Sequence, residues 1–261
     1  MSRSVYLFHL KYSIGSYNKV FALNFDNGVE VVARLPTALA GAPFFTTASE
    51  VATLEFAREV LGIRVPRVFA WSANASANPV GAEYIIMEKI PGVESRHRWT
   101  HIGKAPQVFP LLDGVFDIER SFECAPFSQI GSLYFKDDVR ADLRDHPLFR
   151  PGSLPEDDPE LYRKLDMAKD KYCIGPIADR QWWRSERSQV TYDHGPCEFF
   201  LHSVCQGLAD HSIHRQGLIC APSFLLLSIR NVLGFFAMLL RPHLHDVVVS
   251  HFTMLLPTSN F

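Results

Sequence analysis

The sequence predicts an α+β fold in which a five-stranded antiparallel sheet and one helix form a small lobe, followed by an irregular, mostly helical region. Three observations support this prediction. Residues 5–35 are rich in β-branched and aromatic residues between glycine-containing turns, as strands of an antiparallel sheet are. Residues 46–61 carry apolar residues at helical spacing. Residues 137–171, in the region after Gly92, are charged and interrupted by prolines, which indicates loops with one short helix.

The first three strands are expected at residues 5–14, 17–25 and 29–35. Asn27 and Gly28 predict a tight type I′ hairpin turn between the second and third strands, because this turn needs positive φ angles that both residues tolerate. Pro36 ends the third strand, since proline cannot donate a hydrogen bond to a neighbouring strand.

The helix is expected at residues 46–61. Thr47 is suited to cap its first turn, and Glu50, three residues later, would complete a capping box. Gly62 follows the last turn, where a glycine commonly ends a helix.

Two more strands, at residues 67–72 and 82–88, complete the small lobe, and Pro91-Gly92 closes it as a short linker. Farther along, the sequence predicts a short strand at 131–135 and helices at 107–124, 159–169 and 197–209. The chain is therefore divided into a small lobe at 1–92, a partial large lobe at 93–215 and an apolar tail at 216–261.

The composition excludes several classes of protein. A net charge of -2 gives no electrostatic reason to bind nucleic acid. Five cysteines, an odd number in no repeating pattern, do not indicate a secreted disulfide scaffold and fit a reducing compartment better.

The apolar tail has a stretch, residues 218–240, that is long enough to cross a membrane. Pro222, Arg230 and Asn231 lie inside it, and a central arginine costs roughly 2.5–3.5 kcal/mol on insertion scales. Three interpretations stay open: a contact with a membrane or protein partner through 218–240, a buried pair of helices, or sequence foreign to the fold.

The small lobe contains residues suited to hold an anionic phosphate. Gly15 stands at the turn between the first two strands, where a residue without Cβ lets backbone N–H groups approach a phosphate. Arg34 lies late on the third strand, and Glu50 in the first turn of the helix could pair with it. Taken singly, each has a simpler interpretation: Arg34 as an exposed strand residue and Glu50 as a helix cap.

The last strand of the lobe, which ends in Met87 and Glu88, would form the wall for an adenine ring. The extended segment there offers backbone N–H and C=O groups to the adenine edge. The simpler interpretation is an ordinary core strand.

Several phrases of the sequence, read in order, carry a family resemblance: YNKVF, VVARLP, TTASEVATLEF, VPRVFAWS, NPVGAEYIIMEKIPGV, GSLYFKDD and CIGPIADRQWW. The chain resembles the aminoglycoside-phosphotransferase and choline-kinase-like branch of the protein-kinase fold, and within it the fungal "altered inheritance of mitochondria" (protein nine) group. The resemblance runs from about Gly15 to Trp183.

The resemblance implies a protein-kinase-like small lobe, a nucleotide as ligand and ATP-dependent phosphoryl transfer to an unknown hydroxyl acceptor. It places Gly15 and Asn18 over the phosphates, Arg34 in contact with them, and Glu50 as the partner that orients Arg34. Met87 and Glu88 would face adenine. The resemblance also implies a mitochondrial location, with the cytoplasm as the alternative.

The family's catalytic loop, His-Gly-Asp followed by an Asn, and its later metal-binding Asp have no match in this sequence. We therefore expect weak ATP binding, no bound magnesium and no catalysis, as in a pseudokinase from a truncated or mispredicted gene product. The alternative is a non-catalytic interaction or membrane-docking protein that uses the small lobe and the apolar tail. The spacing of His194, Cys197, His202 and Cys205 lacks the long gap between ligand pairs that zinc sites usually have, so no metal site is predicted.

Overall fold

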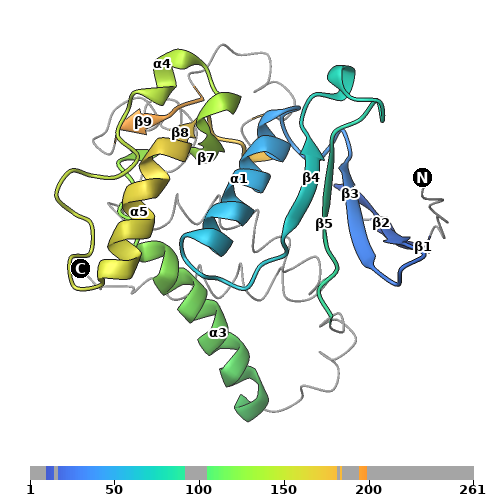
Figure 1. The fold of residues 1–261 in the computed structure, drawn as a ribbon, viewed down its shortest axis with the longest axis horizontal. Helices are drawn as coiled ribbons and strands as arrows, with labels where there is room; N and C mark the ends of the chain where they lie inside the picture. Colours follow the sequence, from blue (N-terminus) through green and yellow to red (C-terminus); the bar gives the residue numbers. More distant parts are fainter. Residues whose placement is uncertain (1–9, 15–16, 92–104, 181–182, 184–193, 199–261) are drawn as a thin grey trace, which may run out of the picture.

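The computed structural model describes residues 10–14, 17–91, 105–180, 183 and 194–198. A long helix, α1, lies in the middle of this part of the chain, with an antiparallel sheet on one side and a second group of helices and short strands on the other (Figure 1). The α+β class expected from the sequence is confirmed.

The sheet has five strands in the order β1-β2-β3-β5-β4, and every neighbouring pair is antiparallel. All five expected strands are present in the described residues. Their bounds are Leu10–Ile14 for β1, Asn18–Asn24 for β2, Glu30–Pro36 for β3, Val68–Ser72 for β4 and Tyr84–Glu88 for β5. A short 3-10 turn, η1 (Ala75–Ala77), lies between β4 and β5.

The turn between β2 and β3 is not the type I′ turn that the sequence predicts. Gly28 has a φ of 78°, but Asn27 does not adopt positive φ. The N–H of Gly28 donates to the carbonyl of Phe25 (2.9 Å), and the N–H of Phe25 donates to the carbonyl of Val29 (2.9 Å). These bonds enclose a three-residue loop, whose turn followed by a left-handed glycine is the next most common hairpin connection.

Helix α1 spans Phe45–Glu59 and ends as expected. Gly62 has a φ of 69°, and the N–H of Ile63 donates to the carbonyl of Ala57 (2.8 Å). The predicted capping box at the start is wrong. The Thr47 hydroxyl donates to Glu83 (2.6 Å), and Glu50 pairs with Arg34, so neither side chain caps the first turn of the helix.

Both sides of α1 are buried, which the sequence did not indicate. On the sheet side, Val51 packs with Ile85 and Met87 of β5. On the other side, Leu54 and Phe56 join a larger core, the second core, to which residues between 122 and 174 contribute. A helix that is buried all round cannot show a strong polar face, so its position is set by two cores at once.

The region beyond the sheet mixes helices with short strand pairs. Its helices are α3 (Ala105–Glu123), α4 (Ala141–Arg144) and α5 (Pro159–Lys171), with a 3-10 turn η2 (Lys136–Asp138). Its strands are β6 (Gln129–Ile130), β7 (Ser132–Phe135), β8 (Tyr172–Gly175) and β9 (Cys197–Glu198), paired as β7-β8 and β6-β9.

The helix expected at 197–209 is contradicted where the structure describes it, because Cys197 and Glu198 pair with β6 as a strand. Residues 199–209 and the expected span at 218–240 lie outside the described residues. No helix within the described ranges is long and apolar enough to cross a membrane.

Candidate functional site

The centre of the candidate site is an ion pair between β3 and α1. Arg34 donates from Nη1 to Oε1 of Glu50, and the two side chains are only 7% and 3% exposed. The pairing expected from the sequence is confirmed. Glu50 reaches the strand because it lies on the stripe of α1 that faces the sheet, beside Val51.

Burial shapes the electrostatics of this pair. Removal from water lowers the pKa of Arg34 to about 10, because desolvation disfavours the charged guanidinium. The side chain therefore stays cationic at neutral pH. Among the described residues, Nε of Arg34 is buried and has no hydrogen-bond acceptor. A buried donor of this kind can be satisfied by a carbonyl oxygen, by a water molecule or by an anionic oxygen.

The first side chain of β2, that of Asn18, lies on the same face of the sheet as this pair. Val20 is opposite Arg34 across the β2-β3 ladder, and Asn18 is two residues earlier on β2, so its side chain lies on the same face. Asn18 is 7% exposed. The structure thus brings Asn18, Arg34 and Glu50 to one side of the sheet, whereas Gly15 lies outside the described residues.

Met87 and Glu88, at the end of β5, have different surroundings. The Met87 side chain is fully buried with Val51 and Ile85, so it is part of the core. Glu88 accepts the N–H of Arg67 (3.1 Å) and lies 3.7 Å from Nη1 of Arg58. Its carboxylate therefore tethers the end of β5 to the residues that follow α1.

Sequence analysis missed Glu83, which lies directly before β5. Its two carboxylate oxygens accept from the Phe44 N–H (3.0 Å) and the Thr47 hydroxyl (2.6 Å), at the start of α1. These contacts join segments 36 to 39 residues apart. No local sequence pattern could have revealed them, because a pattern in the predicted strand that contains Glu83 does not show which distant segment meets its side chain.

A second missed contact joins the sheet to the segment after β8. The guanidinium carbon of Arg180 lies 3.9 Å from the centre of the Tyr17 ring, and Trp183 stacks on Phe45 at 5.5 Å. Trp183 also donates from Nε1 to the carbonyl of Ile177 (2.8 Å). Arg180 therefore contacts the residue before β2, and Trp183 contacts the first residue of α1.

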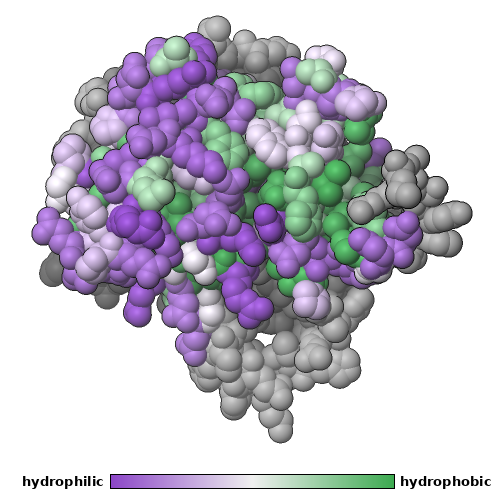
Figure 2. Space-filling view, in the orientation of Figure 1, coloured by the Kyte–Doolittle hydropathy of each residue, from purple (hydrophilic) through white to green (hydrophobic). Residues whose placement is uncertain are grey.

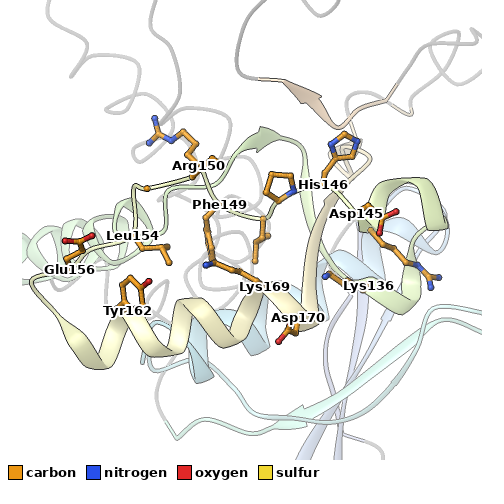
Figure 3. A pocket seen from close by; sticks show the side chains of 15 residues that line it. Lys136, Asp145, His146, Phe149, Arg150, Leu154, Glu156, Tyr162, Lys169 and Asp170 are labelled. Atoms are coloured by element: carbon orange, nitrogen blue, oxygen red, sulfur yellow. The ribbon is translucent and has the colours of Figure 1, made fainter.

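A pocket of about 510 Å³ lies elsewhere, between α5 and the loop 145–156 (Figure 3). Its charged lining is mixed in sign, with Lys136 and Lys169 beside Asp145 and Asp170, and none of its residues belongs to the sheet. Figure 2 shows a mostly hydrophilic surface over α4 and α5, whereas hydrophobic residues gather near β4 and β5. Phe69, which belongs to β4, is 53% exposed.

Two of the four candidate zinc ligands, His194 and Cys197, lie within the described residues. His194 stacks on Trp183, with ring centres 3.8 Å apart, and Cys197 lies on strand β9. His202 and Cys205 lie outside the described residues. No group of three or more His, Cys, Asp or Glu side chains in the described ranges is placed to hold a metal ion.

Two cysteines provide a direct test of the interior. Cys173 is 1% exposed, and burial raises the pKa of its thiol to about 11, whereas Cys124 is exposed. Because the thiolate is the reacting species, we expect iodoacetamide at pH 8 to alkylate Cys124 and to leave Cys173 unmodified. Peptide mass spectrometry measures both sites, and unfolding in guanidinium should make them equally reactive. Equal labelling of the native protein would contradict the packing of β8 on β7.

The fold and site together define an α+β protein in which a buried cation–carboxylate pair joins a five-stranded sheet to a central helix. No family model matches the chain. Its sequence is similar to fungal proteins. A subtelomeric hrmA-associated cluster protein of Aspergillus fumigatus is 38% identical over 187 residues, which are 72% of this chain and 32% of the relative.

Two further relatives carry the name altered inheritance of mitochondria protein 9, mitochondrial. The protein of Komagataella phaffii is 33% identical over 214 residues, covering 78% of this chain and 33% of the relative. The protein of Candida tropicalis is 28% identical over 179 residues, which are 66% of this chain and 27% of the relative. The chain thus spans about a third of the length of the relatives from Aspergillus fumigatus and Komagataella phaffii.

Proposed function

We propose that this chain carries the nucleotide-binding lobe of a kinase-like phosphotransferase whose parent activity is ATP-dependent phosphoryl transfer to a hydroxyl acceptor. The observation that carries the proposal is the buried pair of Arg34 on β3 and Glu50 on α1. Protein kinases assemble a strand cation and a helix carboxylate in the same way before they transfer phosphate.

The chemistry of the pair fits a phosphate ligand. Glu50 holds the guanidinium of Arg34 in one orientation, and Nε is left to donate to a phosphate oxygen. Asn18 lies on the same face of the sheet, where its side chain would approach the same anion. The extended segment after β5 would offer backbone groups to the adenine edge.

We expect this chain to bind ATP weakly and without turnover. Phosphoryl transfer depends on positioning and on metal ions that neutralise the developing charge. The sequence offers neither the His-Gly-Asp loop with its Asn nor a later metal-binding Asp. The phosphoryl acceptor and magnesium therefore belong, in this proposal, to the activity of a longer protein.

We also propose a mitochondrial location. The support is the name shared by the relatives from Komagataella phaffii and Candida tropicalis, each of which is called mitochondrial.

Titration with a fluorescent ATP analogue tests the proposal. We expect saturable binding to the unmodified chain, competed by ATP, and about 10- to 100-fold weaker binding to Arg34→Gln, since hydrogen bonds to charged groups contribute about 1.5–3 kcal/mol. Arg34→Lys, which keeps a cation, should lie between the two. Arg140→Gln is the control, because this side chain is 79% exposed and lies outside the sheet.

Circular dichroism would establish that each variant is folded. Absence of saturable binding to the unmodified chain, or equal affinity of the Arg34→Gln and Arg140→Gln variants, would rule out Arg34 as a phosphate ligand.

A further inference from the structure

We propose that Glu83 is a positioning residue of the nucleotide site, which fixes the start of α1 so that Glu50 meets Arg34. This inference rests on the proposed function of that pair. Glu83 lies directly before β5, and within the described part of the chain its carboxylate binds Phe44 and Thr47 rather than Arg34 or Glu50. It therefore acts through the helix.

The backbone at the start of α1 is strained. Phe44 has φ 68° and ψ -59°, and the N–H of Phe45 donates to the carbonyl of Pro43 (2.8 Å). This is the geometry of a γ-turn with positive φ, which is rare and unfavourable for a residue with a side chain. Such a conformation persists only where its surroundings hold it in place.

Glu83 supplies that hold. One carboxylate oxygen accepts the Phe44 N–H (3.0 Å), at the residue with positive φ. The other accepts the Thr47 hydroxyl (2.6 Å), and the Thr47 side chain is buried. The N-cap residue, Phe44, has no side chain that could bond the first turn. Glu83 instead accepts the N–H of Phe44, as the acidic residue of a capping box does, but from a distant part of the chain.

The position of Glu50 follows from this anchor. Thr47, Glu50 and Val51 are spaced i, i+3 and i+4, so they form one stripe of α1 that faces the sheet. Glu83 fixes Thr47 to the start of β5, and Val51 packs on Ile85 and Met87 of the same strand. The two contacts set both the rotation and the axial position of α1. Glu50, between them, is thereby directed at Arg34 on β3.

The strongest alternative is that Glu83 only stabilises the fold. The two roles differ in what happens to Arg34, because a released Glu50 would leave the guanidinium unpaired and open to reagents. Modification of Arg34 by phenylglyoxal, followed by peptide mass spectrometry, reports this change directly and needs no nucleotide.

We expect Glu83→Ala to raise the rate of Arg34 modification about fivefold to tenfold, because the loss of two hydrogen bonds to a charged group lets the start of α1, and Glu50 with it, move away more often. Glu83→Gln should have a smaller effect, because its amide oxygen still accepts the Phe44 N–H. Thr47→Val is the milder variant on the helix side and should also raise the rate. All rates are measured on protein that circular dichroism shows to be folded.

Glu55→Gln is the matched control, because Glu55 is on the same helix but faces Lys171 and Tyr172 of the second core. It should lower the melting temperature without changing Arg34 modification. If Glu83→Ala and Thr47→Val lower the melting temperature but leave Arg34 as protected as in the unmodified chain, the positioning role is wrong.

Titration of the same variants with the fluorescent ATP analogue separates this proposal from the proposed function. Weaker binding to Glu83→Ala, partly restored in Glu83→Gln, supports both. Faster Arg34 modification in a chain that binds no nucleotide would support the positioning role and reject the nucleotide site. If the unmodified chain binds nucleotide but Glu83→Ala leaves the rate of Arg34 modification unchanged, the nucleotide site is supported and the positioning role is rejected.

Discussion

Replacing Arg34 by Met is expected to lower the free energy of unfolding by about 3–5 kcal/mol, because it leaves the Glu50 carboxylate buried without its partner. Glu50→Leu should cost a similar amount, since it leaves a buried guanidinium. The double variant Arg34→Met/Glu50→Leu should recover most of the loss. Hydrophobic side chains of similar volume often replace a buried ion pair at little cost.

Urea unfolding of the four proteins measures these changes as a double-mutant cycle. The exposed pair of Arg140 and Asp142, with side chains 79% and 63% exposed, is the control and should show almost no coupling. If the double variant is as unstable as the sum of the single variants, the two side chains do not interact in the folded protein.

The recovery of stability has a functional consequence. A double variant that is stable but no longer binds the ATP analogue would show that the pair is kept for binding. In that outcome the fold alone would not need a buried charge at this place, because the apolar pair would stabilise it as well.

Phe56→Ala is expected to have the other large effect, a loss of about 3–5 kcal/mol. The Phe56 ring is completely buried, and its centre lies 5.5 Å from that of Phe127 and 5.4 Å from that of Tyr172. The substitution therefore opens a cavity between α1 and the second core. Phe69→Ala is the control, because Phe69 on β4 is 53% exposed and should lose little.

The shape of the unfolding transition tests a further point. Because α1 packs on the sheet through Val51 and on the second core through Phe56, both cores should unfold together. Fluorescence and circular dichroism should then give the same midpoint. A sheet that stays folded after the second core is lost would contradict the central place of α1.

Local features of the sequence were sufficient to predict the five strands of the sheet and helix α1. The strands are short runs of β-branched and aromatic residues ended by Gly and Pro, which act within a few residues. The pair of Arg34 and Glu50 could also be anticipated, because each residue sits on an element whose type and order the sequence indicated. The hairpin turn was misjudged because Asn27 does not need positive φ when the loop has three residues.

The capping-box prediction was wrong because other residues bind the two side chains that would form it. Thr47 and Glu50 have the spacing of a capping box, but Glu83 and Arg34 bind them instead. Both partners are distant in sequence, so no local pattern could indicate these contacts.

The sequence by itself determined the α+β class, the order of the five strands along the chain and the presence of a cation and a carboxylate on neighbouring elements. Only the tertiary structure decided that α1 is buried on both sides, that Glu83 holds its strained start and that the segment after β8 reaches Tyr17. The physical reason is the distance along the chain over which each kind of interaction acts. Backbone preferences act between near neighbours, whereas burial and the pairing of charges depend on which surfaces meet when the chain is folded.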